Sequence, residues 1–224
     1  MSLMKRMGRV VTLAGLPVVA ALVVPSAQAQ SKFELTPVAG SLYPLTSMCT
    51  DCNNNNDGTD YRGVQLNSIA VGGALSYWVS RTIGVAAFVG WAPSRIQEDT
   101  LGSVLGIRDG ISVKGNLLLA NARLLFRPAR TNLHFIVGGG IVKRGGEFWK
   151  FIKDNSGGKL TSPAGILGIG VRASVTPKFA LNISAEGNFY SFDPHFGVGA
   201  DPSNGTKLQA DLMVSVGVPI GLSR

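Results

Sequence analysis

Two cysteines are the most reactive side chains of this 224-residue sequence. Cys49 and Cys52 begin the stretch CTDCNNNNDGTD and are the only cysteines of the chain. A pair at this spacing can form a disulfide, act as a thiol redox centre or bind zinc. A redox pair belongs in a βαβ unit and zinc needs two further ligands, and the sequence offers neither nearby. In an exported protein, where thiols oxidise, we therefore expect a disulfide that closes a small loop.

The residues after Cys52 resemble the first half of a calcium-binding loop. Asn53, Asn55 and Asp57 supply oxygen ligands at alternate positions, and Gly58 suits the turn. The twelfth position of such a loop holds a bidentate glutamate, but here it is Val64. We therefore expect a solvated turn rich in Asn and Asp, without a metal ion.

One of the two histidines has neighbours that could support nucleophilic or acid–base chemistry. His195 lies in NFYSFDPHFG, close to Ser191 and Asp193, whereas His134 stands within LHFIVGGGIV. A histidine beside a serine and a carboxylate is a minimal catalytic set. A histidine in a loop is usually only solvated, so we expect no catalytic residue and no cofactor.

The start of the chain indicates export. Three basic residues precede an uncharged apolar run from Val10 to Pro25, and Ala27-Gln28-Ala29 follows. These are the three parts of a secretory signal peptide, which we predict over residues 1–29, with one domain over residues 30–224. An uncleaved anchor helix is the alternative, but two prolines interrupt the run. The domain stays modestly basic, and export makes nucleic acid an unexpected partner.

Period-two alternation recurs through the rest of the chain and predicts β-strands. It is clearest in LQADLMVSVGVPI, where seven apolar residues from Leu208 to Ile220 share one face. Most of these segments have the length of a strand that crosses a bilayer at a tilt. The 29 glycines argue against a helical protein. The predicted strands are residues 33–43, 69–79, 82–91, 116–126, 133–142, 165–175, 179–189 and 208–220.

The connections between these strands alternate strictly between short and long. The short ones are residues 80–81, 128–132 and 176–178, and the long ones are residues 46–62, 92–113, 143–162 and 192–206. Tight turns at one end and long loops at the other are typical of a transmembrane β-barrel. Hydrocarbon offers no partner for backbone N–H and C=O groups, so the sheet must close. The sequence therefore predicts an all-β fold, an eight-stranded antiparallel up-and-down transmembrane β-barrel.

The ionisable residues of the clearest strands lie on the face opposite the apolar one. They are two bases and two acids, namely Arg123, Arg172, Glu186 and Asp211. The interior of an eight-stranded barrel is just wide enough for side chains to fill it. We predict that ion pairs among these four residues close the lumen.

Aromatic residues gather near both ends of the predicted strands, as rings do at the two membrane interfaces. Near the short turns these are Tyr77, Trp78, Phe126 and Phe179, and near the long loops they are Trp91, Phe189, Tyr190 and Phe192.

The third long loop mixes basic with aromatic residues in KRGGEFWKFIKDNSGGK (143–159). If Phe148, Trp149 and Phe151 face outward together with the bases, this loop could rest on anionic lipopolysaccharide headgroups. The candidate lipopolysaccharide contacts are Lys143, Arg144, Lys150 and Lys153. A plain extension of the hairpin above the membrane is the alternative.

Taken together, these patterns resemble small bacterial outer-membrane barrels of the OmpA/OmpX-like group, in the family of outer-membrane β-barrel domain proteins. The resemblance covers residues 31–224 and includes VGGALSYWVSRTIGVAAFVGW (71–91) and KFELTPVAGSLYPL. It implies the barrel fold and a place in the bacterial outer membrane. One departure is the end of the chain, Gly221-Leu222-Ser223-Arg224, where such barrels usually carry an aromatic residue.

We expect a monomeric barrel without enzymatic activity, whose structural or adhesive role is carried by four surface loops. Its expected partners are outer-membrane lipid, lipopolysaccharide and an extracellular ligand that the sequence does not identify. A narrow pore for small solutes is the first alternative. A soluble periplasmic lipocalin-like binder is the second, and it requires an apolar interior and a polar exterior.

Overall fold

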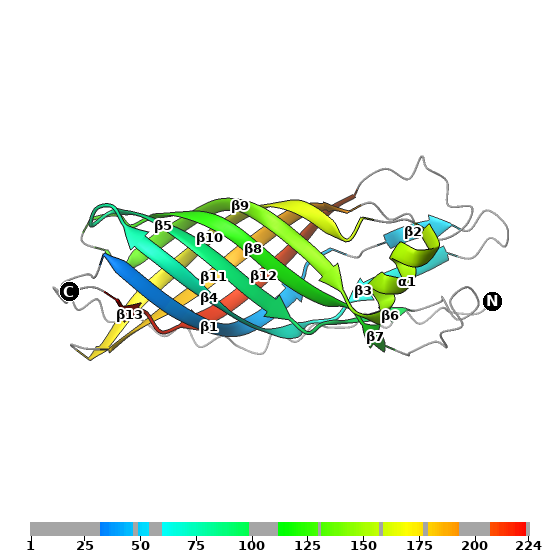
Figure 1. Cartoon of the computed structure of the whole chain (residues 1–224), viewed down its shortest axis with the longest axis horizontal. Coiled ribbons are helices and arrows are strands. Elements are labelled where there is room, and N and C mark those ends of the chain that lie inside the picture. Colours follow the sequence, from blue (N-terminus) through cyan, green and yellow to red (C-terminus); the bar gives the residue numbers. More distant parts are fainter. Residues whose placement is uncertain are drawn as a thin grey trace, which may run out of the picture.

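Eight long antiparallel strands follow one another along the chain and close into a barrel (Figure 1). The computed structural model describes residues 32–46, 49–53, 60–98, 112–129, 131–156, 159–176, 179–192 and 207–222. The barrel strands are β1 (Phe33–Pro44), β4 (Ser68–Trp78), β5 (Ile83–Ala92), β8 (Asn116–Phe126), β9 (Leu133–Gly145), β10 (Thr161–Thr176), β11 (Phe179–Phe192) and β12 (Lys207–Gly217).

The last strand closes the barrel by pairing with the first. β12 pairs with β11 on one side and with β1 on the other, from Val38 opposite Gly217 to Pro44 opposite Asp211. After a break at residues 218–219, the short β13 (Ile220–Gly221) continues along β1. Closure leaves no unpaired barrel edge, which is the condition for crossing hydrocarbon. The predicted fold class is confirmed.

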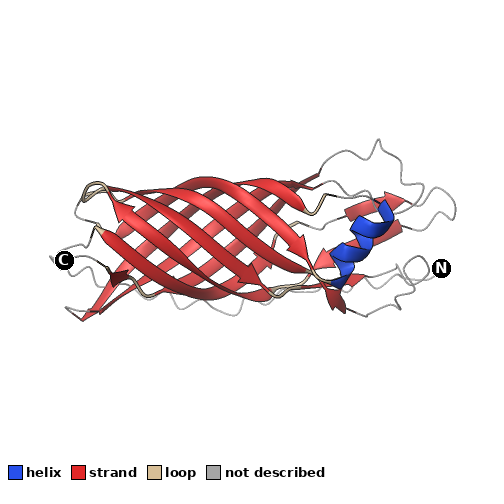
Figure 2. Cartoon of the chain, in the orientation of Figure 1, coloured by secondary structure: helices blue, strands red, loops and turns tan. Residues whose placement is uncertain are grey.

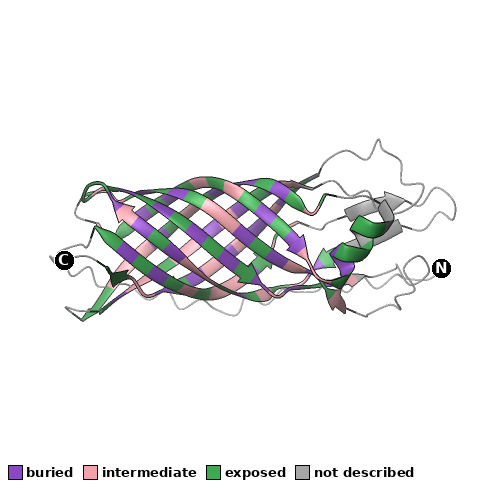
Figure 3. Cartoon of the chain, viewed as in Figure 1, coloured by how far each residue is buried: buried purple, intermediate pink, exposed green. Residues whose placement is uncertain are grey.

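Exposed and buried residues alternate along most of the length of the barrel strands (Figure 3). In β5 the alternation is unbroken over all ten residues. The outward face carries Val, Leu, Ile and Phe side chains, such as Ile69 and Leu167, while the inward face holds polar groups such as Glu186 and Ser215. This is the reverse of what a soluble lipocalin-like binder requires and matches a barrel in a bilayer.

Outward aromatic rings mark both ends of this apolar belt. At the short-turn end Phe33 contacts Tyr77, with ring centroids 4.7 Å apart. At the long-loop end Trp91 and Phe189 are exposed. The prediction that Trp78 and Tyr190 belong to these girdles was wrong, because both are buried inside the barrel.

Beyond the long-loop end lies a second, smaller unit that the sequence did not predict (Figures 1 and 2). It contains a four-stranded antiparallel sheet in the order β2 (Cys49–Asn53), β3 (Asp60–Gln65), β6 (Arg95–Glu98) and β7 (Ser112–Lys114). The first two long loops thus supply two strands each. The third supplies the helix α1 (Glu147–Ser156).

The helix α1 packs on this small sheet through a compact apolar cluster. Ile96 of the sheet contacts Phe148 and Trp149 of the helix, and all three are almost fully buried. Gly146 immediately precedes the helix with a positive φ of 99°, and a Cβ there would lie 2.6 Å from the Lys114 carbonyl oxygen. We call β2, β3, β6, β7 and α1 the loop module. The described residues contain no helix that is long and apolar enough to span a membrane.

Candidate functional site: the barrel lumen and its mouth

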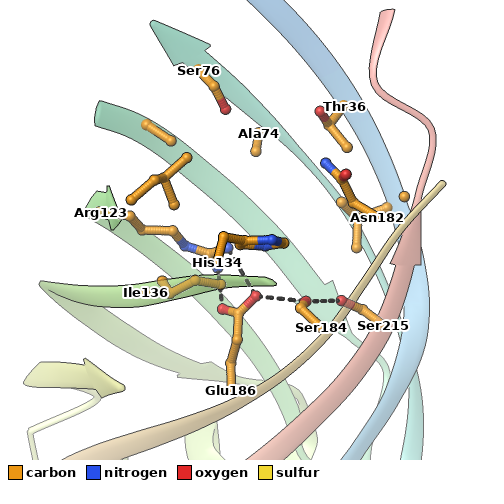
Figure 4. Close-up of a pocket in the computed structure, with 14 residues that line it drawn as sticks. Thr36, Ala74, Ser76, Arg123, His134, Ile136, Asn182, Ser184, Glu186 and Ser215 are labelled. Atoms are coloured by element: carbon orange, nitrogen blue, oxygen red, sulfur yellow. Dashed lines mark hydrogen bonds and ion pairs between the residues drawn. The ribbon is translucent and has the colours of Figure 1, made fainter. Parts of the chain in front are cut away.

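Arg123 of β8 and Glu186 of β11 form an ion pair near the middle of the lumen (Figure 4). Two contacts join them, of 3.0 Å between Nη1 and Oε1 and 2.8 Å between Nη2 and Oε2. Ser184 also donates to Glu186 Oε1, at 3.0 Å. The Arg123 guanidinium lies 3.9 Å from the centroid of the Phe88 ring, and its Nε donates to Asn121. Packing and hydrogen bonds therefore hold both charges in place.

The other two predicted lumen residues have different partners from those we expected. Arg172 pairs with Glu34 of β1 at 2.9 Å, and Trp78 Nε1 donates to the same carboxylate at 3.1 Å. Asp211 accepts a 2.7 Å hydrogen bond from the Tyr190 hydroxyl. The prediction that the four residues pair only with one another was thus wrong in part. Arg172 pairs with Glu34, and Asp211 is bonded to Tyr190.

Arg127 extends the polar cluster at the short-turn end of the lumen. It follows β8 in the turn, and its guanidinium lies 4.3 Å from the centroid of the Trp78 ring. Burial lowers the pKa of Arg127 to about 10, the charge of Arg172 lowers it as well, and Glu34 opposes both. Arg127 therefore remains positively charged at neutral pH.

Arg144 lies in the mouth of the lumen and does not face lipopolysaccharide. Its guanidinium is between the rings of Trp149 and Tyr190, at 5.2 and 5.1 Å from their centroids. Its Nη1 donates to Ser162. Only 2% of Arg144 is exposed, so its prediction as an outward contact was wrong. The outward placement of Phe148 and Trp149 was also wrong, because both are buried where α1 packs against Ile96 of the small sheet.

Glycines on the inner face make room for the large lumen side chains. A Cβ on Gly84 would lie 2.8 Å from the Trp78 ring, and one on Gly168 would lie 2.8 Å from Glu186 Cγ. At Gly170 a Cβ would come within 2.4 Å of the His134 imidazole. These contacts explain why strands of a narrow barrel alternate very small with very large inward residues.

A cavity of about 60 Å³ lies beside the Arg123–Glu186 pair. His134 and Asn182 line it, together with the hydroxyls of Ser184 and Ser215 (Figure 4). Two buried atoms at this cavity, His134 Nδ1 and Asn182 Oδ1, have no hydrogen-bond partner among the described residues. The volume and the polar groups of the lining suit ordered water molecules.

An apolar cluster occupies part of the lumen in the half nearer the long loops, next to buried polar residues such as Asn188 and Asp211. Besides Tyr190, it includes Leu42, Phe88, Leu117, Leu119 and Met213, each no more than 2% exposed. We call this set the apolar plug. The prediction that ion pairs close the lumen was therefore incomplete, because these apolar side chains also pack inside it, on the long-loop side of the Arg123–Glu186 pair.

Several predicted sites fall outside the described residues or side chains. The signal peptide, His195, Asp193, Asn55, Asp57 and Gly58 all lie in segments that the structure does not describe. Cys49 and Cys52 are placed as part of β2, opposite Gly63 and Tyr61, but their side chains are not described. The disulfide therefore stays a prediction. Within the described segments, no three metal-binding side chains come together.

Three of the four candidate lipopolysaccharide contacts are exposed at the long-loop end. Lys143 lies on the outward face of β9, paired with Leu118 and Thr161, so it stands at the upper edge of the apolar belt. Lys150 and Lys153 are exposed on α1. Their only described acidic neighbours on the helix are Glu147, which pairs with Lys114 at 3.8 Å, and Asp154. Counted over the described residues, this surface carries net positive charge.

No protein-family model matches the sequence, and no curated protein matches it. Solved structures with a similar fold include OprG, an outer membrane protein from Pseudomonas aeruginosa, at 14% identity and a TM-score of 0.48, over 86% of this chain and 98% of that one. Neisserial surface protein A is 13% identical with a TM-score of 0.49, over 86% and 98% of the two chains. The outer membrane protein AlkL is 15% identical with a TM-score of 0.47, over 90% and 96%. The assignment of the fold rests on the strand pairing of the barrel itself.

Proposed function

We propose that this protein is an integral outer-membrane barrel with a structural or adhesive role at the cell surface. Three features support the location: the apolar belt, the two aromatic girdles and the closed sheet. The bacterial outer membrane is where such barrels reside. The predicted signal peptide over residues 1–29 would deliver the chain there.

The loop module is the observation that carries the surface role. Loops that only connect strands need no core of their own, yet here Ile96, Phe148 and Trp149 form one. Folded loops present a fixed surface and lose little conformational entropy when they bind a partner. The module thus gives the barrel a shaped surface on the side that the long loops occupy.

The apolar plug makes the alternative function, a narrow pore, less favourable. A hydrated ion would have to pass the buried cluster that contains Phe88, Leu119 and Met213. The polar cavity beside Arg123 extends through only part of the lumen. A passive channel would require these apolar side chains to move apart.

Lipopolysaccharide is the partner that the basic residues at the loop end would contact. Lys143 stands at the upper edge of the belt, where the headgroups of the outer leaflet begin. Lys150 and Lys153 add positive charge on α1. Each Lys near an anionic membrane surface contributes about 1 kcal/mol of attraction. We propose that these three lysines bind its phosphate groups, and that the barrel acts as a monomer in the lipid.

The test compares the barrel in bilayers with and without lipopolysaccharide. We expect lipopolysaccharide to raise the temperature at which the folded band is lost in the boiled versus unboiled gel assay. Changing Lys143, Lys150 and Lys153 to serine should remove most of that increase. The matched control changes Lys32 and Arg81, at the opposite end, and should keep it. An equal increase in the triple variant and the wild type would refute the lipopolysaccharide contact.

A further inference from the structure

A shallow groove of about 550 Å³ crosses the outer wall of the barrel. Ala87 of β5 and Ala122 of β8 are direct neighbours in the sheet and leave the wall thin at this point. Larger outward side chains border them toward the short turns, where Val85 is paired with Leu124. Large apolar side chains of Phe33, Leu75, Tyr77 and Val137 also line it, and the lining is completed by Ser76, Ala86, Arg123 and Gly138. The groove therefore spans β1, β4, β5, β8 and β9.

The groove lies in the half of the apolar belt that is nearer the short turns. Tyr77 and Phe33, which form the aromatic girdle at that end, are part of its border. Val85 lies two residues from the start of β5. In the orientation proposed above, the short turns face the periplasm. The groove then opens into the hydrocarbon of the periplasmic leaflet, where its occupant must be apolar.

Positive charge is concentrated just below the groove. Lys32 immediately precedes Phe33, and Arg81 lies in the turn that joins β4 to β5; both are exposed. Arg127 begins the neighbouring turn between β8 and β9, but its guanidinium packs on Trp78 inside the lumen and is not part of this charge. Among the acidic side chains that the structure describes, Glu34 is the one at this end, and it is buried and already paired with Arg172. The headgroup level beneath the groove is thus electropositive and matches an anionic phosphate group.

The shape of the groove favours a hydrocarbon chain over a second copy of the barrel. A neighbouring barrel presents a convex wall, which would touch the border at Tyr77 and Leu124 and leave the alanines uncovered. An acyl chain is narrow enough to lie against Ala87 and Ala122 while its headgroup stays at the interface.

From the groove and the charges together, we propose that the barrel binds one anionic phospholipid of the periplasmic leaflet. One acyl chain lies in the groove over Ala87 and Ala122, and the phosphate lies near Lys32 and Arg81. This inference rests on the proposed outer-membrane location, which sets the leaflet. The apolar groove provides the site for the chain, and the charges select the headgroup.

Native mass spectrometry of the full-length protein, purified from membranes in a mild detergent, tests the proposal. The probes are phosphatidylglycerol and phosphatidylethanolamine with identical acyl chains. We expect one phosphatidylglycerol to bind at least fivefold more tightly than phosphatidylethanolamine. Ala87→Leu and Ala122→Leu, made singly, each fill the groove and should weaken binding of phosphatidylglycerol at least fivefold. Changing Lys32 and Arg81 to Gln should abolish the preference between the two lipids.

The matched control is Ala185→Leu, the same change on the outward face of β11, across the barrel from the groove. It should bind phosphatidylglycerol as the wild type does, and a gel shift confirms that every variant is folded. Wild-type affinity in both groove variants, an equal loss in the control, or equal affinity for the two lipids would each overturn the proposal. Membrane fractionation tests the location separately. If the protein is found in the outer membrane but the groove variants bind phosphatidylglycerol as the wild type does, the lipid site alone is refuted.

Discussion

Replacing Glu186 with alanine tests whether the central ion pair stabilises the barrel. Both partners are almost fully buried, with side-chain exposures of 7% for Arg123 and 2% for Glu186. Without the carboxylate, Arg123 keeps its hydrogen bond to Asn121 and its contact with the Phe88 ring. Its two terminal nitrogens, however, lose the negative charge that compensates them.

The expected loss follows from the cost of a buried charge without its partner. Breaking such a pair typically costs about 3–5 kcal/mol. The adjoining cavity of about 60 Å³ gives water access to Arg123, so the lower end of this range applies. With a urea dependence of about 2 kcal/mol per M, a loss of about 3 kcal/mol lowers the unfolding midpoint by about 1.5 M.

Urea unfolding of the refolded barrel in detergent, followed by tryptophan fluorescence, measures this shift. The matched control is Glu147→Ala, which removes the exposed pair with Lys114 and should cost at most about 1 kcal/mol. Combining Glu186→Ala with Arg123→Ala should recover part of the loss, as expected for directly coupled residues. A Glu186→Ala midpoint equal to that of the control variant would refute the reasoning.

Three further predictions concern the loop module and the packing of the barrel. Trp149→Ala should loosen α1, so that trypsin cleaves the third loop several times faster while the urea midpoint of the barrel stays unchanged; an unchanged cleavage rate would contradict the packing of α1 on the sheet. Gly170→Ala should cost about 1–3 kcal/mol because its Cβ displaces the imidazole beside it, whereas Gly165→Ala, with nothing within 4 Å, should be neutral. Equal unfolding midpoints would contradict this account of the inner glycines. Mass analysis after alkylation without reductant should find Cys49 and Cys52 unlabelled, and two added groups would disprove the disulfide.

The barrel strands could be predicted from the sequence because the alternation of outward and inward residues shows within each strand by itself. Outward residues must be apolar and inward residues must fit a narrow interior. The residue type therefore changes at every second position along a strand. Residues 116–126 were predicted with the bounds that β8 has in the structure. The alternation also placed Arg123 and Glu186 on the inner face correctly.

The partners across the lumen could not be predicted in the same way. Which inward residues meet depends on the stagger between strands far apart in the sequence, which no single segment encodes. Glu34 illustrates this. It lies between the outward residues Phe33 and Leu35, so the alternation alone places its carboxylate on the inner face. Its pairing with Arg172, 138 residues away, appears only when the barrel closes.

The loop module was missed because its strands are short and lack a clear alternation. Ser112–Lys114 has three residues, too few for any period to show. The helix left a weak signal, since Phe148, Trp149 and Ile152 recur at the three- and four-residue spacing of one helix face. Burial of Trp149 depends on Ile96, which lies in another loop.

Single-channel conductance in a planar bilayer tests the central claim, that the lumen is closed and the function lies in the loops. The refolded protein is first shown to be folded by the boiled versus unboiled gel shift. The account predicts no conductance steps from the wild type. It predicts none from Glu186→Ala either, because the apolar plug remains. Discrete steps from the folded wild-type barrel would contradict the account and identify the protein as a pore.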